Sequence, residues 1–258
     1  MRLMKRILSA AAVLALSASL LVGCSSGTAS SVPVSASSAA ESTVSSVEET
    51  ASSAVDENEA AAAQLLNDLT GSYQELWPVI LADEYKQTWL DDCTALVGED
   101  NAEAAFEKLS SMVTGDVYGE DAVKAYANGG GAYFCGFTND LATLTFDGET
   151  STISGTDKDG NVLFSHTYHY IGMEPVRGLY EFESDDADSG EFTYFFLAPD
   201  TSAETYHIEF RYGSDAEALS QYDAGEYAYW VASGISTDCD QTMIDNCIEL
   251  FCTENLAG

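Results

Sequence analysis

Histidine is scarce in this chain, and one of its three copies lies in a stretch with a regular polar pattern. In ETYHIEFRYG, residues 204–213, polar and apolar side chains alternate, so Thr205, His207 and Glu209 share one face of a predicted strand. Imidazole and carboxylate groups are zinc ligands, and a spacing of two residues lets both reach one ion. His207 and Glu209 are therefore candidate metal ligands. The alternative is that His207 is a polar residue on a solvated strand.

The other two histidines, His166 and His169, lie three residues apart in the predicted strand HTYHYIG. Residues three apart on a strand point to opposite faces, so these two histidines cannot both bind one ion. Either could join His207 from a neighbouring strand, and we select His169 as the third candidate ligand. Both are equally interpretable as hydrogen-bonded or surface histidines.

Sequence motifs that mark common enzyme classes are missing. The sequence contains no G-x-S-x-G, no H-E-x-x-H and no glycine loop in the context that binds phosphate. We therefore predict that the protein is not an enzyme.

The chain is strongly acidic. It has 43 acidic and 9 basic residues and a net charge of −34, and such a surface repels nucleic acid phosphates. We predict no nucleic acid partner.

The N-terminus has the features of an export signal. Residues 1–23 begin with basic residues and continue with an apolar run too short for an ordinary membrane span. Small residues directly before Cys24 resemble a bacterial lipobox, in which that cysteine receives lipid. Residues 24–62 are mostly Ser, Ala, Val, Thr and Glu, a composition typical of a disordered tether. We expect a lipid-anchored protein on the extracytoplasmic face of the cell membrane.

Residues 63–258 are predicted to form one domain of the α+β class. Helical patterns come first, short strands separated by turn residues follow, and helical patterns return at the C-terminus. Such strands indicate a small antiparallel β-barrel or sandwich with N- and C-terminal helices packed at its ends. The helices are expected within 65–93, 101–113, 121–127, 215–222 and 242–252, and the strands within 142–148, 150–155, 161–172, 179–184, 191–199 and 204–213.

Five cysteines fall in this domain, Cys93, Cys135, Cys239, Cys247 and Cys252. An odd number leaves at least one thiol without an intramolecular partner. Their spacing matches no common zinc motif, so we expect structural or free cysteines rather than ligands.

Two segments carry a resemblance to a known family. GEFTYFFLAPDTSAETYHIEFRYGSDAEAL and the later YAYWVASGI resemble the ZinT (YodA) domain. LTGSYQELWPVI is similar to that family's N-terminal helix, HTYHYIG to its central strand and IDNCIEL to its closing helix. The resemblance covers roughly residues 66–251, and it implies a calycin-type, lipocalin-like barrel that binds zinc outside the cytoplasm and delivers it to a metal importer of the ABC class.

The family's three zinc-binding histidines are only partly present. One precedes an Ala-Pro step, which Ala198 and Pro199 match, but its position is occupied by Phe195. The other two form a His-x-His pair, of which Thr205 replaces the first and His207 preserves the second. The resemblance thus implies zinc as the ligand and His207 as the retained family position, looking into the opening of the barrel.

A second function keeps the barrel and omits the metal. A small barrel can hold one small ligand at its mouth, or dock a protein partner. The aromatic residues of 194–196 and 227–230 would then line the site. They are equally compatible with ordinary core packing.

Overall fold

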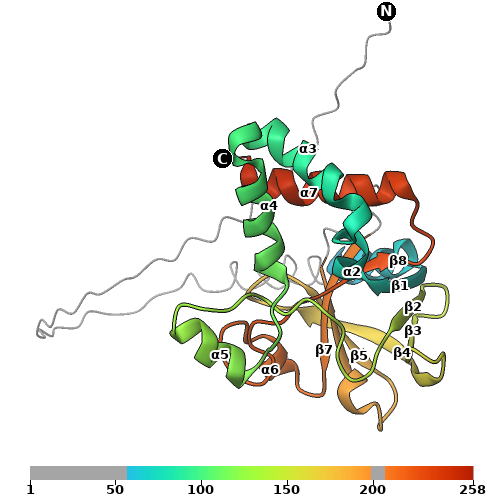
Figure 1. Ribbon diagram of the computed structural model, residues 1–258. Helices are drawn as coiled ribbons and strands as arrows, with labels where there is room; N and C mark the ends of the chain where they lie inside the picture. Colours follow the sequence, from blue (N-terminus) through green and yellow to red (C-terminus); the bar gives the residue numbers. More distant parts are fainter. Residues whose placement is uncertain (1–56, 199–206, 258) are drawn as a thin grey trace, which may run out of the picture. The chain divides into compact units, whose positions relative to one another are not determined.

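The computed structural model describes residues 57–198 and 207–257 (Figure 1). The leader, Cys24 and most of the predicted tether lie outside the described residues, as does Thr205. Among the described helices, none combines the length and apolar character that a membrane span requires.

Eight antiparallel strands form a closed barrel in sequence order, and β1 pairs with β8 to complete it. The predicted fold class, an antiparallel barrel with flanking helices, is confirmed. The strands are β1 (Gly71–Glu75), β2 (Thr143–Asp147), β3 (Thr152–Thr156), β4 (Val162–Met173), β5 (Tyr180–Ser184), β6 (Tyr194–Leu197), β7 (His207–Gly213) and β8 (Ala232–Ser236). The helices are α2 (Leu76–Ile80), α3 (Lys86–Val97), α4 (Glu99–Val113), α5 (Glu120–Ala127), α6 (Ala216–Leu219) and α7 (Gln241–Leu256), with short 3₁₀ turns at Asp83–Tyr85 and Gly190–Phe192.

Two strands differ from the sequence expectations. The region 65–93 was predicted to be helical, but β1 interrupts it, and β8 was not predicted as a strand. Both are short, and each begins or ends next to glycine or serine residues, which weakens the period-two pattern. They pair with each other, so the strands that close the barrel are those with the weakest local signal.

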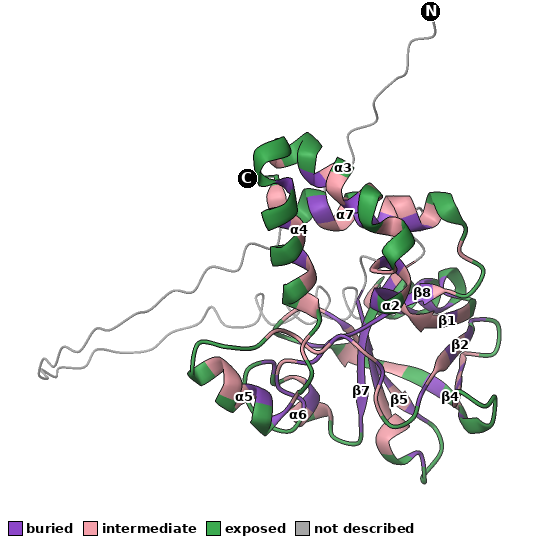
Figure 2. Cartoon of the chain, viewed as in Figure 1, coloured by how far each residue is buried: buried purple, intermediate pink, exposed green. Residues whose placement is uncertain are grey.

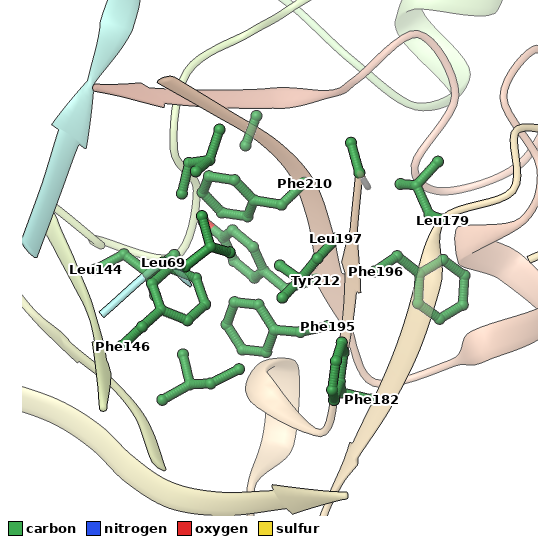
Figure 3. Packing of buried hydrophobic residues seen from close by; sticks show 14 of the residues in the cluster. Leu69, Leu144, Phe146, Leu179, Phe182, Phe195, Phe196, Leu197, Phe210 and Tyr212 are labelled. Atoms are coloured by element: carbon green, nitrogen blue, oxygen red, sulfur yellow. The ribbon is translucent and has the colours of Figure 1, made fainter. Parts of the chain in front are cut away.

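Aromatic side chains fill the barrel interior (Figure 3). Phe195, Phe210 and Tyr212 are fully buried and stack with ring centroids 5.4–6.4 Å apart. The hydroxyl of Tyr212 accepts a hydrogen bond from the backbone N–H of Thr138 at 2.6 Å and donates one to its carbonyl oxygen at 2.9 Å. The phenol is therefore satisfied although it is buried, and the barrel is a packed core.

An N-terminal helix, residues 57–68, packs against the barrel core and begins inside the segment that composition assigned to the tether. Its apolar residues Ala62, Leu65 and Leu66, together with Leu69 directly after the helix, are buried in the same cluster as the barrel aromatics. The helix therefore belongs to the folded domain. Its alanine-rich sequence hid this, because alanine contributes little to a hydrophobic pattern.

A second apolar core lies outside the barrel wall. There α2, α3, α4 and α7 pack together and against the outer face of β8 (Figures 1 and 2). Pro78 is accommodated because it occupies the first turn of α2, where its missing N–H has no helical acceptor. Asp240 begins α7 by accepting a hydrogen bond from the N–H of Met243 at 3.0 Å. This helical layer covers one side of the barrel.

Arg211 is a fully buried cation on the outer face of β7. Its guanidinium donates to the carbonyl oxygens of Leu219 and Tyr227 and stacks on Tyr222 at 4.4 Å. It thereby fixes the chain that follows α6 against the barrel wall. Burial lowers the pKa of this guanidinium, while nearby Glu174, itself buried, partly offsets that effect.

We predict that Leu66→Ala will lower the free energy of unfolding by about 2–5 kcal/mol, because it removes a buried side chain of the helix from a packed core. Chemical denaturation monitored by circular dichroism measures the change. The matched control is Gln64→Ala on the exposed face of the same helix, which should change stability by no more than about 0.5 kcal/mol. Equal effects of the two variants would show that the helix is not part of the core.

Candidate functional site

His207 and Glu209 lie on the outer face of β7. Their neighbours Ile208 and Phe210 point into the barrel core, and alternation places the two polar side chains outside. His207 is paired across the strands with Ile235, whose side chain belongs to the helical core. The expectation that His207 looks into the barrel opening is therefore not met: this histidine faces the helical layer.

A small cavity of about 30 Å³, which we call the β7 cavity, lies between β7 and the helices α2 and α7. Four of its lining residues carry zinc-ligand types, namely His207 and Glu209 from β7 and Cys247 and Glu254 from α7. Apolar residues of α2 and α7 form the rest of the wall. The space is large enough for a single ion or water molecule.

The donors of the β7 cavity do not form a ready-made metal centre. Within residues 57–198 and 207–257, no three His, Cys, Asp or Glu side chains are grouped so that they could hold an ion. Burial raises the pKa of the Cys247 thiol to about 12, so this sulfur is protonated at neutral pH. His207 and Glu209 are thus the two possible metal ligands that β7 places side by side on its outer face.

The structure places His169 elsewhere. It lies on the exposed outer face of β4, and β5 and β6 separate that strand from β7 in the barrel. Its Nδ1 is 2.8 Å from a carboxylate oxygen of Asp185. His166 makes the equivalent contact with Asp186 at 2.7 Å from the opposite face of β4. Both histidines are held by aspartates of the loop after β5, and neither lines the β7 cavity.

A larger cavity of about 340 Å³ lies on the other side of Trp77, and we call it the α2–α4 cavity. It is bounded by α2, the C-terminal end of α4 and the extended segment 133–136, and its residues include Glu75, Trp77, Leu81, Val113 and Phe134. The sequence analysis did not identify this cavity. It is built from the ends of elements that are far apart in the chain.

Trp77 separates the two cavities and has an unusual polar group. Its side chain is buried against Phe251, with ring centroids 4.7 Å apart, yet within the described part of the chain its indole N–H has no hydrogen-bond acceptor. Burial raises the pKa of the nearby Cys135 thiol to about 12, and the indole N–H of Trp77 acts in the opposite direction without meeting the geometric criteria of a hydrogen bond. Leaving such a donor unpaired costs about 1–3 kcal/mol.

Among the described residues, none of the five cysteines of the domain is in a disulfide bond. Cys93 and Cys252 face each other between α3 and α7 with their sulfur atoms 3.9 Å apart. Cys239 is the only one of the five that is not buried. The expectation of structural or free cysteines agrees with this arrangement.

Comparison with known proteins gave matches only among solved structures. No family model and no curated protein matches the chain. The zinc-bound ZinT-like domain of AdcA from Streptococcus pneumoniae is similar, with 17% identity and a TM-score of 0.45 over 71% of this chain and 89% of that chain. Zinc-bound AdcA of the same organism is also similar, with 14% identity and a TM-score of 0.43 over 72% of this chain and 35% of that chain.

These matches agree with the family that the sequence resembles. At such identities and TM-scores the likeness concerns the overall fold, and the site is judged from its own residues.

We predict that Cys239 alone of these five thiols will react readily with Ellman's reagent in the folded protein at pH 8. Cys93, Cys135, Cys247 and Cys252 are buried, so the reagent cannot reach their sulfur atoms, whereas Cys239 is partly exposed. Burial raises the pKa of all five thiols, including Cys239, so accessibility rather than pKa sets the difference. In the mature chain carrying Cys24→Ala, absorbance of the released dye counts the thiols before and after unfolding in guanidinium chloride. Cys239→Ser in that chain should abolish the native reaction, and fast reaction of that variant would contradict the burial of the other four.

Proposed function

We propose that the protein is an extracytoplasmic lipoprotein whose barrel domain binds zinc as reversible cargo at the β7 cavity. The observation that carries this proposal is that His207 and Glu209 share one face of β7 and line one ion-sized space. Nitrogen and oxygen donors two residues apart on a strand reach a common ion without rearrangement of the backbone. Zinc is among the divalent cations that this pair of donors suits, and it is the metal that the family resemblance implies.

The binding would be weak compared with a structural zinc site. Closed sites use four protein ligands, whereas here two donors are presented by the strand and water would complete the coordination. Cys247 and Glu254 from α7 line the same space and would add ligands if their side chains turned toward the ion. Weak, partly hydrated coordination suits a carrier that must release its ion.

The charge of the chain also favours a cation. With a net charge of −34, the protein raises the local concentration of divalent cations near its surface. This effect is not specific to zinc, and it would be strongest at low ionic strength. Together with the lipid anchor proposed at Cys24, it would keep zinc close to the membrane, where an importer of the ABC class would take it up.

We predict that His207→Ala will weaken zinc binding about tenfold or more, because one of two principal donors is removed. Isothermal titration of zinc into the metal-stripped mature chain, carrying Cys24→Ala to keep it soluble, measures the affinity. We expect a micromolar dissociation constant for the unaltered site.

His169→Ala is the matched control, since it removes an imidazole from the outer face of β4, away from the β7 cavity. It should leave the affinity unchanged. An absence of zinc binding, or equal affinities of the two histidine variants, would remove the proposed site.

A separate prediction concerns the anchor. Cys24→Ala should abolish incorporation of labelled palmitate into the protein, because the thiol that accepts lipid is lost, and globomycin, which blocks the lipoprotein signal peptidase, should make a larger precursor accumulate. Immunoprecipitation followed by gel electrophoresis measures both the label and the size. Cys239→Ala serves as the control cysteine, and unchanged labelling of Cys24→Ala would rule out this mode of attachment.

The second candidate function, a small ligand held at the barrel mouth or a docked partner, was assigned to the aromatics of 194–196 and 227–230. Of these, Phe195, Phe196 and Trp230 are fully buried in the barrel core cluster. They act as packing residues there.

A further inference from the structure

Two buried cysteines meet where α3 and α7 pack side by side (Figure 1). The sulfur atoms of Cys93 and Cys252 are 3.9 Å apart, and neither residue is exposed to solvent. A disulfide bond is about 2.05 Å long, so each sulfur would need to move by only about 1 Å to form one. A displacement of this size is within the range of side-chain rotation and requires no movement of the helices.

The surroundings of the two thiols are apolar. Trp89, Leu109 and Ile248 are fully buried in the same helical core. A thiol in such an environment is a weak hydrogen-bond donor with few acceptors, whereas a disulfide has no donor to satisfy. The helical core therefore accommodates the oxidised pair at least as well as the two thiols.

Electrostatic interactions oppose the packing of α7 against α3. Burial raises the pKa of Asp92 on α3, and the nearby carboxylates of Glu249 and Asp245 on α7 raise it further. The sequence of α7 contains no lysine or arginine. Like charges thus lie on both sides of an interface whose centre is apolar, and a covalent bond between the helices would offset their repulsion.

The position of the two cysteines along the chain adds to the effect of such a bond. They are separated by 159 residues, and a cross-link that closes a long loop strongly restricts the unfolded chain. Cys252 also lies in the C-terminal part of α7, close to the end of the chain. Chain ends are among the segments that open most readily, so a bond at this point would hold α7 in place.

We propose that Cys93 and Cys252 are a modification site, at which an oxidant that itself carries a disulfide converts the two thiols to a disulfide bond between α3 and α7. One thiolate of the pair attacks the disulfide of the oxidant and forms a mixed disulfide, releasing the first thiol of the oxidant. The second thiolate attacks the protein sulfur of the mixed disulfide and releases the second. The two electrons and two protons that the pair loses are recovered in the two thiols of the reduced oxidant.

The exchange takes place before the helical core closes. Burial raises the pKa of both thiols, so little thiolate is present at the pair in the folded protein at neutral pH. During folding both cysteines are open to the oxidant until α7 packs on α3. The supply of oxidant rests on the proposed location outside the cytoplasm, whereas the approach of the two sulfur atoms does not.

Refolding in a glutathione buffer tests the pair without membrane or zinc. The mature chain with Cys24→Ala and Cys239→Ser keeps four thiols, all of them buried. It is unfolded in guanidinium chloride, refolded with a mixture of oxidised and reduced glutathione, and quenched with acid. Ellman's reagent in guanidinium chloride should then count two thiols instead of four. Mass spectrometry should show the loss of two hydrogen atoms without added glutathione, and a linked peptide pair that contains Cys93 and Cys252.

The hold on α7 is measured by comparing the oxidised chain with the same chain reduced by a phosphine. The oxidised form should unfold at a temperature about 5 °C or more higher, because the cross-link restricts the unfolded chain. Amide hydrogen exchange in residues 241–256 should be at least about tenfold slower in the oxidised form, because local opening of α7 is suppressed.

Two variants of this chain locate the bond. Cys93→Ala should keep its three thiols after refolding and should show no difference between the two conditions. Cys135→Ala is the matched control, because it removes a buried thiol outside α3 and α7, and its count should fall from three to one. Circular dichroism establishes that each variant is folded, and Cys252→Ala repeats the test from the other helix if Cys93→Ala is not.

Three results overturn the proposal. A thiol count that stays at four in the parent chain, or that falls equally in Cys93→Ala and Cys135→Ala, excludes a bond between Cys93 and Cys252. Equal unfolding temperatures and equal exchange of the oxidised and reduced forms exclude the hold on α7.

Discussion

The pairing of β1 with β8 is the constraint on which the rest of this structure depends. A closed barrel has no free edge, so every strand has one face toward the interior and one face outward. Aromatic rings fill the interior, and the N-terminal helix packs against the same core. The β7 cavity and the α2–α4 cavity accordingly lie outside this packed core.

Helices cover part of the outer wall of the barrel, and cavities form between these helices and the strands. α2 and α7 pack over β7 and β8, and the imperfect fit between helices and sheet leaves the β7 cavity and the α2–α4 cavity. Trp77 lines both. Trp77 of the short helix α2 is thus shared by the β7 cavity, which is lined by possible metal ligands, and the larger, mainly apolar α2–α4 cavity. Substitution of a residue that lines only one of these cavities should alter that cavity alone.

Two buried polar atoms lower the stability of this fold, because each is removed from water without gaining a hydrogen bond. The Nε of Arg211 and the Nε1 of Trp77 have no hydrogen-bond acceptor among the described residues. Arg211 offsets its desolvation through its other nitrogens, which bind backbone carbonyl oxygens, and through stacking on Tyr222. Trp77 has no comparable compensation beyond its ring packing against Phe251. Both residues hold their surroundings together through packing.

The sequence by itself determined the features that depend on local periodicity. Alternation around His207 predicted β7 and the shared face of His207 and Glu209, and the order of helical and strand patterns predicted an α+β barrel with helices at both ends. It could not show that helices would cover the polar face of β7, because alternation defines two faces without naming their neighbours. It also missed β1 and β8, whose short sequences become strands through their pairing with distant partners. Only the tertiary structure decided that His169 lies on a strand apart from His207. The α2–α4 cavity likewise exists only in the tertiary structure, since residues from α2, α4 and the segment 133–136 meet there through packing over the barrel wall.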